Sequence, residues 1–157
     1  MNLDSMNRWL TLVANVGVLA GIIFLGYELQ QNTVANRVEA ASNFNSSFSE
    51  IELLIVGNPD FAELLTKGRE GTEINGSDQL RLWVFYNQAL RVWEFAHYQY
   101  ESEVVDEDNW QPRRAFMLEI LSGDVGLLNH WRQHKNQYSP AFNTMINSIV
   151  VELENQY

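Results

Sequence analysis

The feature that most constrains this chain is an apolar run near its amino terminus, WLTLVANVGVLAGIIFLGY, from Trp9 to Tyr27. No side chain in this run is charged near neutral pH. At about 1.5 Å of rise per residue, a helix of this length covers roughly the 30 Å hydrocarbon core of a bilayer. A core helix of a small soluble domain would normally carry charge on one face. The run therefore predicts a membrane-spanning helix.

A cleaved secretory signal is the alternative interpretation of such a run, with Arg8 as its basic region. The apolar run is longer than the usual signal core of about 7–15 residues. The first plausible cleavage site, Val38-Glu39-Ala40, lies well beyond its end. The sequence favours a span that is retained.

Composition limits the partners and the chemistry. The 157 residues include 10 basic and 20 acidic side chains, for a net charge of −10. Such a field repels polyanions, so we expect no nucleic-acid partner. The absence of cysteine excludes disulfides, thiolate catalysis and cysteine-ligated metal sites. The residues outside the span are enough for one soluble domain and too few for two.

The span has two different faces when it is projected at about 100° per residue. One face is aliphatic and suited to lipid. The other carries small and polar residues, among which Gly17 and Gly21 have the spacing that lets two helix backbones approach closely. An unpaired amide in hydrocarbon is costly, so this face should contact protein. We predict helix–helix association through Ala14, Asn15, Gly17, Gly21 and Glu28.

A pore is the alternative use of the same residues. In a ring of helices, Asn15 would line a narrow channel and Glu28 would guard it. The large side chains of Val18, Ile22 and Leu25 crowd the same arc and would leave little of it wet. Association without a pore is therefore favoured.

The rest of the chain predicts helices only, because no segment alternates with a period of two. The stalk-like segment 29–56 has the pattern of an amphipathic helix, in which the spanning helix can continue. A break is the alternative, and its place would be the stretch Ser42–Ser49, since serine and asparagine are poor helix formers. Gly57 should end this helix. Further helices are expected over 60–67, 79–100, 110–121, 125–135 and 141–154. The fold class is all-α, with residues 1–28 as the membrane-spanning helix and its flank, and 29–157 as an acidic helical bundle in which helices over 58–157 follow the stalk.

Several helix starts can be assigned from capping residues. Asn58-Pro59 and Ser139-Pro140 each offer an N-cap followed by a proline at the first helical position. Ser77 or Asp78 should cap the helix 79–100, which is apolar around most of its circumference and belongs at the centre of the bundle. Asp108 or Asn109 should cap the helix 110–121, with Pro112 in its first turn.

Two spacings could hold a metal ion. Glu94 and His97 form an ExxH pattern, but ferritin-like carboxylate sites need two such motifs and this chain has one. His130 and His134 stand one helical turn apart, yet Trp131 occupies the place of the glutamate in the metalloprotease pattern.

A structural role is the favoured interpretation of these four residues. Glu94 is expected to pair with an arginine, and His97 to pack among aromatic rings. His130 and His134 are expected to complement the dipole at the end of their helix. The candidate partners of Glu94 are Arg91, Arg113 and Arg114. We predict no catalytic residue, no metal site and no cofactor.

Several stretches together resemble a widespread group of small, uncharacterised bacterial membrane proteins with one span and a helical soluble domain. The resemblance covers most of the chain and implies the inner membrane, without an assigned activity. Basic residues are nearly balanced across the span, with Arg8 before it and Arg37 after it, so they leave the side of the soluble domain undecided. The matching stretches are Tyr27-Glu28-Leu29-Gln30-Gln31-Asn32-Thr33, Arg91-Val-Trp-Glu94-Phe-Ala-His-Tyr98-Gln99-Tyr100, Trp110, and Trp131 with Ser139-Pro140-Ala-Phe142.

The predicted function is that of a non-enzymatic, membrane-anchored oligomeric scaffold or regulatory subunit. Its predicted contacts are membrane lipid and copies of itself, with another membrane protein as a further candidate. Two alternatives stay open: an oligomeric channel or transport component with Asn15 and Glu28 at a pore, and a metal-dependent enzyme that uses Glu94 and His97.

Overall fold

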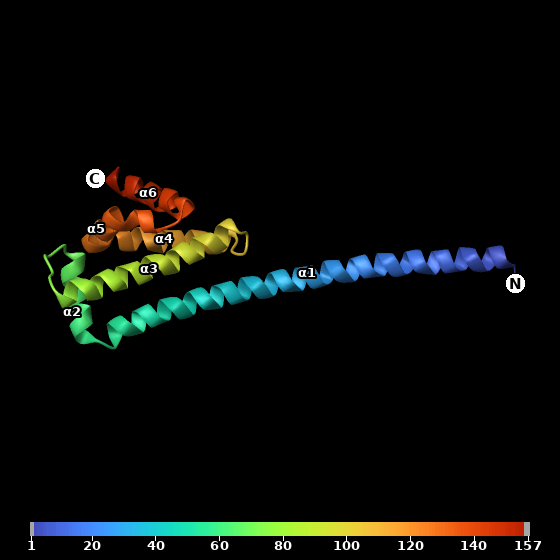
Figure 1. The fold of residues 1–157 in the computed structure, drawn as a ribbon, viewed down its shortest axis with the longest axis horizontal. Helices are drawn as coiled ribbons and strands as arrows, with labels where there is room; N and C mark the ends of the chain where they lie inside the picture. Colours follow the sequence, from blue (N-terminus) through green and yellow to red (C-terminus); the bar gives the residue numbers. More distant parts are fainter. Residues whose placement is uncertain (1, 156–157) are drawn as a thin grey trace. The chain divides into compact units, whose positions relative to one another are not determined.

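The computed structural model describes residues 2–155, which form six α-helices and one short 3₁₀ helix, with no strand in that range (Figure 1). The predicted all-α class, with a long apolar N-terminal helix that leads into a helical domain, is confirmed. In chain order the elements are α1 (Leu3–Val56), α2 (Pro59–Arg69), α3 (Ser77–Glu101), α4 (Glu107–Gly123), α5 (Val125–His134), η1 (Lys135–Gln137) and α6 (Pro140–Glu154).

Two compact units divide the chain, Met1–Glu39 and Ala40–Tyr157. The first contains the N-terminal part of α1. The second contains the remainder of α1 together with α2 to α6, and is called the bundle below. This boundary lies further along the chain than the one expected after residue 28, so residues 29–39 group with the first unit and residues 40–56 with the bundle.

Helix α1 is continuous, so the stalk continues the apolar helix, and the alternative of a break in the stretch 42–49 is wrong. The reason is tertiary packing in the bundle. The ring of Phe48 lies 6.4 Å from that of Trp93 on α3 and 5.3 Å from that of Phe116 on α4. These contacts outweigh the low helix propensity of serine and asparagine. The helix ends as predicted before Gly57, whose N–H donates to the Leu53 carbonyl at 2.8 Å.

The two predicted Asx/Ser–Pro starts are confirmed. The Asn58 side chain accepts a hydrogen bond from the Phe61 N–H at 3.2 Å, and Ser139 Oγ accepts one from the Phe142 N–H at 3.4 Å. Each cap satisfies a backbone donor that the first helical turn leaves unpaired.

The other two predicted starts were wrong. Helix α3 begins after Gly76 without a side-chain cap. Helix α4 begins earlier than expected, because Asp106 caps it by accepting from the Asn109 N–H at 3.0 Å. Pro112 therefore lies inside α4 instead of in its first turn, where it removes one backbone hydrogen bond of the helix.

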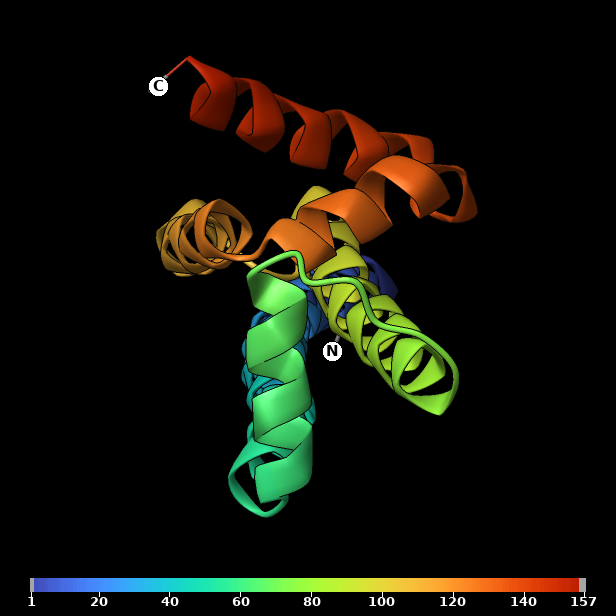
Figure 2. The same cartoon turned by 90° about the vertical axis from the view of Figure 1, so that its left-hand side faces the viewer.

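Helix α3 is the centre of the bundle, as predicted. It contacts α2, α4, α5 and α6. Leu90, Trp93 and Ala96 on α3 are almost fully buried. Figures 1 and 2 show α5 between α2 and α6 in both views. The core is thus built around one helix that is apolar on most sides.

Candidate functional site

The first candidate site is the apolar part of α1. Within residues 2–155, α1 is the one helix long and apolar enough to cross a membrane, and 0% of its most apolar 18-residue window is buried. Leu12, Val16 and Ile23, on the face expected to meet lipid, are each more than half exposed. Aliphatic surface of this extent is unfavourable in water. The described chain itself does not cover this apolar surface of α1.

The predicted association residues all lie on this exposed part of α1. A Cβ atom added at Gly17 or Gly21 would meet no atom within 4 Å. At about 100° per residue, Ala14, Gly17, Gly21 and Glu28 fall within an arc of about 60°. We call these four residues the glycine strip. The space above it is open to a second helix.

The placement of Asn15 on the same face as the glycines was wrong, because in the regular helix α1 Asn15 points about 160° away from Gly17 around the helix axis. The hydroxyl of its neighbour Thr11 donates to the Asn7 carbonyl at 2.9 Å, whereas the Asn15 amide has no hydrogen-bond partner among residues 2–155. In hydrocarbon such an amide requires a partner. Asn15 and Glu28 are about 140° apart, so a straight helix does not present both to one narrow pore.

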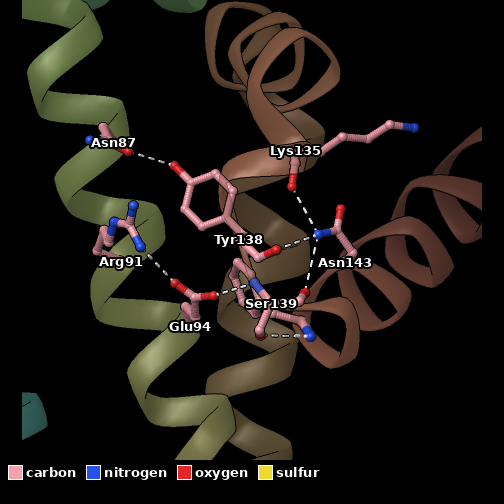
Figure 3. Close-up of polar contacts among 8 residues, drawn as sticks. Asn87, Arg91, Glu94, Lys135, Tyr138, Ser139 and Asn143 are labelled. Carbon is pink, nitrogen blue, oxygen red and sulfur yellow. Dashed lines mark hydrogen bonds and ion pairs between the residues drawn. The ribbon is translucent and has the colours of Figure 1, made fainter.

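The second candidate site is a polar cluster where α3 meets the start of α6 (Figure 3). Glu94 Oε1 accepts from the Ser139 N–H at 2.6 Å, and Glu94 Oε2 accepts from Arg91 at 3.3 Å. The Tyr138 hydroxyl donates to Asn87 Oδ1 at 2.8 Å. The guanidinium of Arg91 lies 5.2 Å from the centroid of the Tyr138 ring. Burial raises the pKa of Tyr138 to about 12, so its hydroxyl stays a donor.

One amide holds the adjoining turn together. Asn143 Nδ2 donates to the carbonyls of Lys135, Tyr138 and Ser139 at 2.8, 3.0 and 3.1 Å (Figure 3). The polar groups of the cluster form hydrogen bonds with one another. It fastens the start of α6 to α3, which is a structural role.

The predicted pairing of Glu94 with Arg91 is confirmed, and so is the packing of His97 among aromatic rings. His97 is 6% exposed, with ring centroids 5.4 Å from Trp110 and 6.0 Å from Phe142. Burial lowers the pKa of His97, although Glu101 stands 3.7 Å from its Nε2. A metal shared by Glu94 and His97 would require Glu94 to release both of its partners. Among residues 2–155 no group of three or more His, Cys, Asp or Glu side chains is arranged to hold a metal ion.

The helix-dipole explanation was wrong for His130. This side chain is 7% exposed, and its ring lies 5.8 Å from that of Tyr86 and 6.2 Å from that of Trp83. Burial, reinforced by His134 at a centroid distance of 4.6 Å, lowers the pKa of His130 to about 4. An imidazole that is neutral at pH 7 contributes no charge to a helix end.

Sequence reasoning missed a buried acid, Asp124. It is 4% exposed, and its Oδ1 accepts from the Leu127 N–H at 2.8 Å and from the Tyr86 hydroxyl at 3.1 Å. Arg69 Nε lies 4.0 Å from its other oxygen. Burial raises the pKa of Asp124, against the effect of these hydrogen bonds. The position after Gly123 and before α5 signals an N-cap, but nothing in the sequence signals the burial.

The acid is buried because α2 and α5 approach closely. A Cβ atom added at Gly126 would lie 2.5 Å from the Gly68 carbonyl oxygen and 2.6 Å from the Tyr86 hydroxyl. Only glycine allows this contact. Asp124 and its partners Tyr86, Leu127 and Arg69 therefore have a structural role in the packing of the bundle.

No protein-family model, no curated protein and no solved structure matches this chain. Function has to be argued from the residues themselves. The stretches on which the family resemblance rests lie, within the bundle, in the polar cluster and in the rings around His97. Their arrangement is that of a core, with Trp131 and Phe142 in edge-to-face contact at 5.8 Å.

Proposed function

We propose that this protein is a non-enzymatic, membrane-anchored scaffold or regulatory subunit of the bacterial inner membrane, which assembles with copies of itself through α1. One observation carries the proposal. The chain leaves a bilayer-length, uncharged stretch of α1 uncovered, while the side chains of the bundle that could support chemistry take part in its packing.

The membrane anchor follows from the free energy of apolar exposure. Burial of aliphatic surface is favourable by roughly 25 cal/mol per Å². In the stretch Trp9–Tyr27 every residue is exposed. A bilayer covers such a stretch on all sides, and a helix satisfies its own backbone hydrogen bonds there.

Self-association follows from the glycine strip and from Asn15. Between helices in lipid there is no hydrophobic driving force, so close backbone contact and hydrogen bonds between helices decide association. Gly17 and Gly21 allow close backbone contact, and the unpaired Asn15 amide can form a hydrogen bond between helices. Because the two point in different directions, each helix can meet two neighbours.

The test is the mass of the full chain in mild detergent, measured by light scattering after gel filtration. The wild type is expected to have a mass of several chains. The double variant Gly17→Ile with Gly21→Ile should fall to the mass of one chain, since isoleucine holds the backbones apart. Asn15→Leu should weaken the assembly, so that its mass falls on dilution.

Val16→Ile is the control. Val16 lies about 100° from both Gly17 and Asn15 around the axis, on the exposed face expected to meet lipid. This variant should keep the wild-type mass. A double variant that keeps the wild-type mass, or a wild type that is already a single chain, contradicts the proposed assembly.

A further inference from the structure

An apolar groove of about 680 Å³ opens on the bundle between the C-terminal part of α1, the start of α2 and the first half of α3. Phe61, at the base, is 3% exposed, whereas Leu54, Val84 and Leu80 on the walls are 47%, 52% and 62% exposed. This volume lies within the range of about 300–1,000 Å³ typical of binding pockets. The groove is a contiguous apolar surface that the described chain leaves uncovered.

Two helical rows form its walls. Ile51 and Leu54 stand three residues apart on α1, and Leu80 and Val84 stand four apart on α3, so each row follows one helix face. Gly57 ends α1, and the Asn58 cap starts α2 there. After this turn, Phe61 of α2 joins the lining of the groove, with its ring 5.1 Å from that of Phe85 on α3.

An acidic hollow adjoins the groove, and the two share Arg81. The hollow is lined by four carboxylates and two cations. The cations are engaged inside it, since Lys67 lies 2.8 Å from Glu63 and Arg81 lies 3.3 Å from Asp78. The two remaining acids, which have no ion pair among residues 2–155, are Asp60 and Glu73.

We propose that the groove and the hollow together bind an amphipathic helix of a partner protein, with apolar side chains in the groove and Lys or Arg side chains against Asp60 and Glu73. Grooves of this kind receive helices through apolar residues at i, i+3 or i+4, and i+7. The inference rests on the proposed function as a scaffold or regulatory subunit, and it names the chemistry of the partner.

Charge selects this occupant over a second copy. The bundle, residues 40–157, carries 17 acidic and 8 basic side chains, a net charge of −9, so the surface of a second bundle is a poor electrostatic match for the acidic hollow. An anionic amphiphile is also disfavoured, because Arg81 already bonds Asp78 and lies 5.4 Å from the centroid of the Phe61 ring. Complementary charge favours a cationic segment.

The experiment uses the full chain in nanodiscs of zwitterionic lipid and a fluorescent helical peptide of Leu and Lys. Its leucines occupy i, i+3, i+4 and i+7, and binding is read by anisotropy after subtraction of empty nanodiscs. The wild type should bind. Val84→Glu, and independently Leu80→Glu, should weaken binding at least tenfold, and Asp60→Asn with Glu73→Gln should weaken it severalfold and reduce its salt dependence.

Val151→Glu on α6 is the matched control, because Val151 is 54% exposed and lies outside the groove. It should bind like the wild type. Tryptophan fluorescence of each variant checks that the bundle is folded.

Four outcomes overturn the inference: no binding to the wild type, equal binding by Val84→Glu and Val151→Glu, equal binding of a Leu–Glu peptide with the same apolar face, or displacement of the peptide by oleate. A fall in the detergent mass of the Val84→Glu variant would also overturn it, since a second copy would then occupy the groove. These results are separate from the test of the proposed function, because none of these substitutions lies in the first unit.

Discussion

The space around the glycines differs between the two units. In the first unit, added Cβ atoms at Gly17, Gly21 and Gly26 meet nothing within 4 Å. In the bundle, a Cβ atom at Gly126 would lie 2.5 Å from a carbonyl oxygen of α2. The bundle glycine permits a contact that the chain itself makes. The glycines of the first unit leave room for a contact that the described chain does not make.

The hydrogen bonds of polar side chains differ between the units in the same way. In the bundle, Asp124 and Glu94 each accept two hydrogen bonds. One bond of each joins separate elements, from Tyr86 on α3 to Asp124 and from the Ser139 N–H to Glu94 on α3. In the first unit, the Thr11 hydroxyl bonds only to its own helix, and Asn15 has no partner among residues 2–155. The bundle is therefore complete as a folded unit, whereas the apolar helix depends on its surroundings.

Protonation should separate the two regions most strongly. The folded-state pKa of His130, about 4, lies below its ordinary value of 6.5, so its contribution to stability is present above pH 6.5 and is lost as the pH falls towards 4. The free energy of unfolding of the bundle should fall by about 3 kcal/mol over this window. Urea unfolding of the full chain in mild detergent, followed by tryptophan fluorescence, measures it.

His130→Phe should remove this part of the pH dependence, because it fills the same space without a titratable group. The stretch Trp9–Leu25 has no ionisable side chain, so its retention in the membrane should not change between pH 7 and pH 4. A His130→Phe variant with the wild-type slope would show that another group is responsible.

The same substitution in the two regions should have different effects. Gly126→Ala should lower the free energy of unfolding of the bundle by about 2 kcal/mol, because the added methyl group overlaps the Gly68 carbonyl and the Tyr86 hydroxyl. Gly26→Ala should cause no loss, since its methyl group meets open space. Denaturant unfolding of both variants makes the comparison, and equal losses would remove the contrast.

The polar cluster should account for a smaller effect. Ser139→Ala removes the side-chain cap of α6 and should lower the free energy of unfolding by about 1 kcal/mol. Ser148→Ala, an exposed position within the same helix, is the control and should change it by less than about 0.5 kcal/mol. If the two variants unfold at the same urea concentration, the cap does not stabilise the bundle.

What the sequence predicted well depends on local chemistry. Asn58 and Ser139 were identified as caps because each precedes a proline, so that only one start is consistent with the pattern. Around α4, Asp106, Asp108 and Asn109 are all good caps, and the choice among them depends on packing. The stretch 42–49 reads as a break from propensity alone, and Phe48 keeps it helical through contacts with α3 and α4.

What the sequence missed depends on contacts between distant residues. Asp124 and His130 look like ordinary exposed side chains of a helix start and a helix end. Asp124 is buried where two glycines far apart in the sequence, Gly68 and Gly126, let α2 and α5 approach, and His130 is buried against Trp83 and Tyr86 of α3. The groove beside α3 could not be predicted either, because it is lined by residues of three helices whose packing the sequence does not show. The glycine strip of the candidate span, in contrast, could be chosen from periodicity, because a single helix fixes the directions of its side chains, although Asn15 was assigned to the wrong face.

The central claim is that the apolar part of α1 lies in a bilayer, and alkaline carbonate extraction of membranes from cells that express the full chain tests it most directly. The account predicts that the wild-type chain stays in the membrane pellet at pH 11. It also predicts that a variant with Val16→Arg and Ile23→Arg, which places two charges on the lipid-facing side, is released. Recovery of the wild-type chain in the carbonate supernatant would contradict the account.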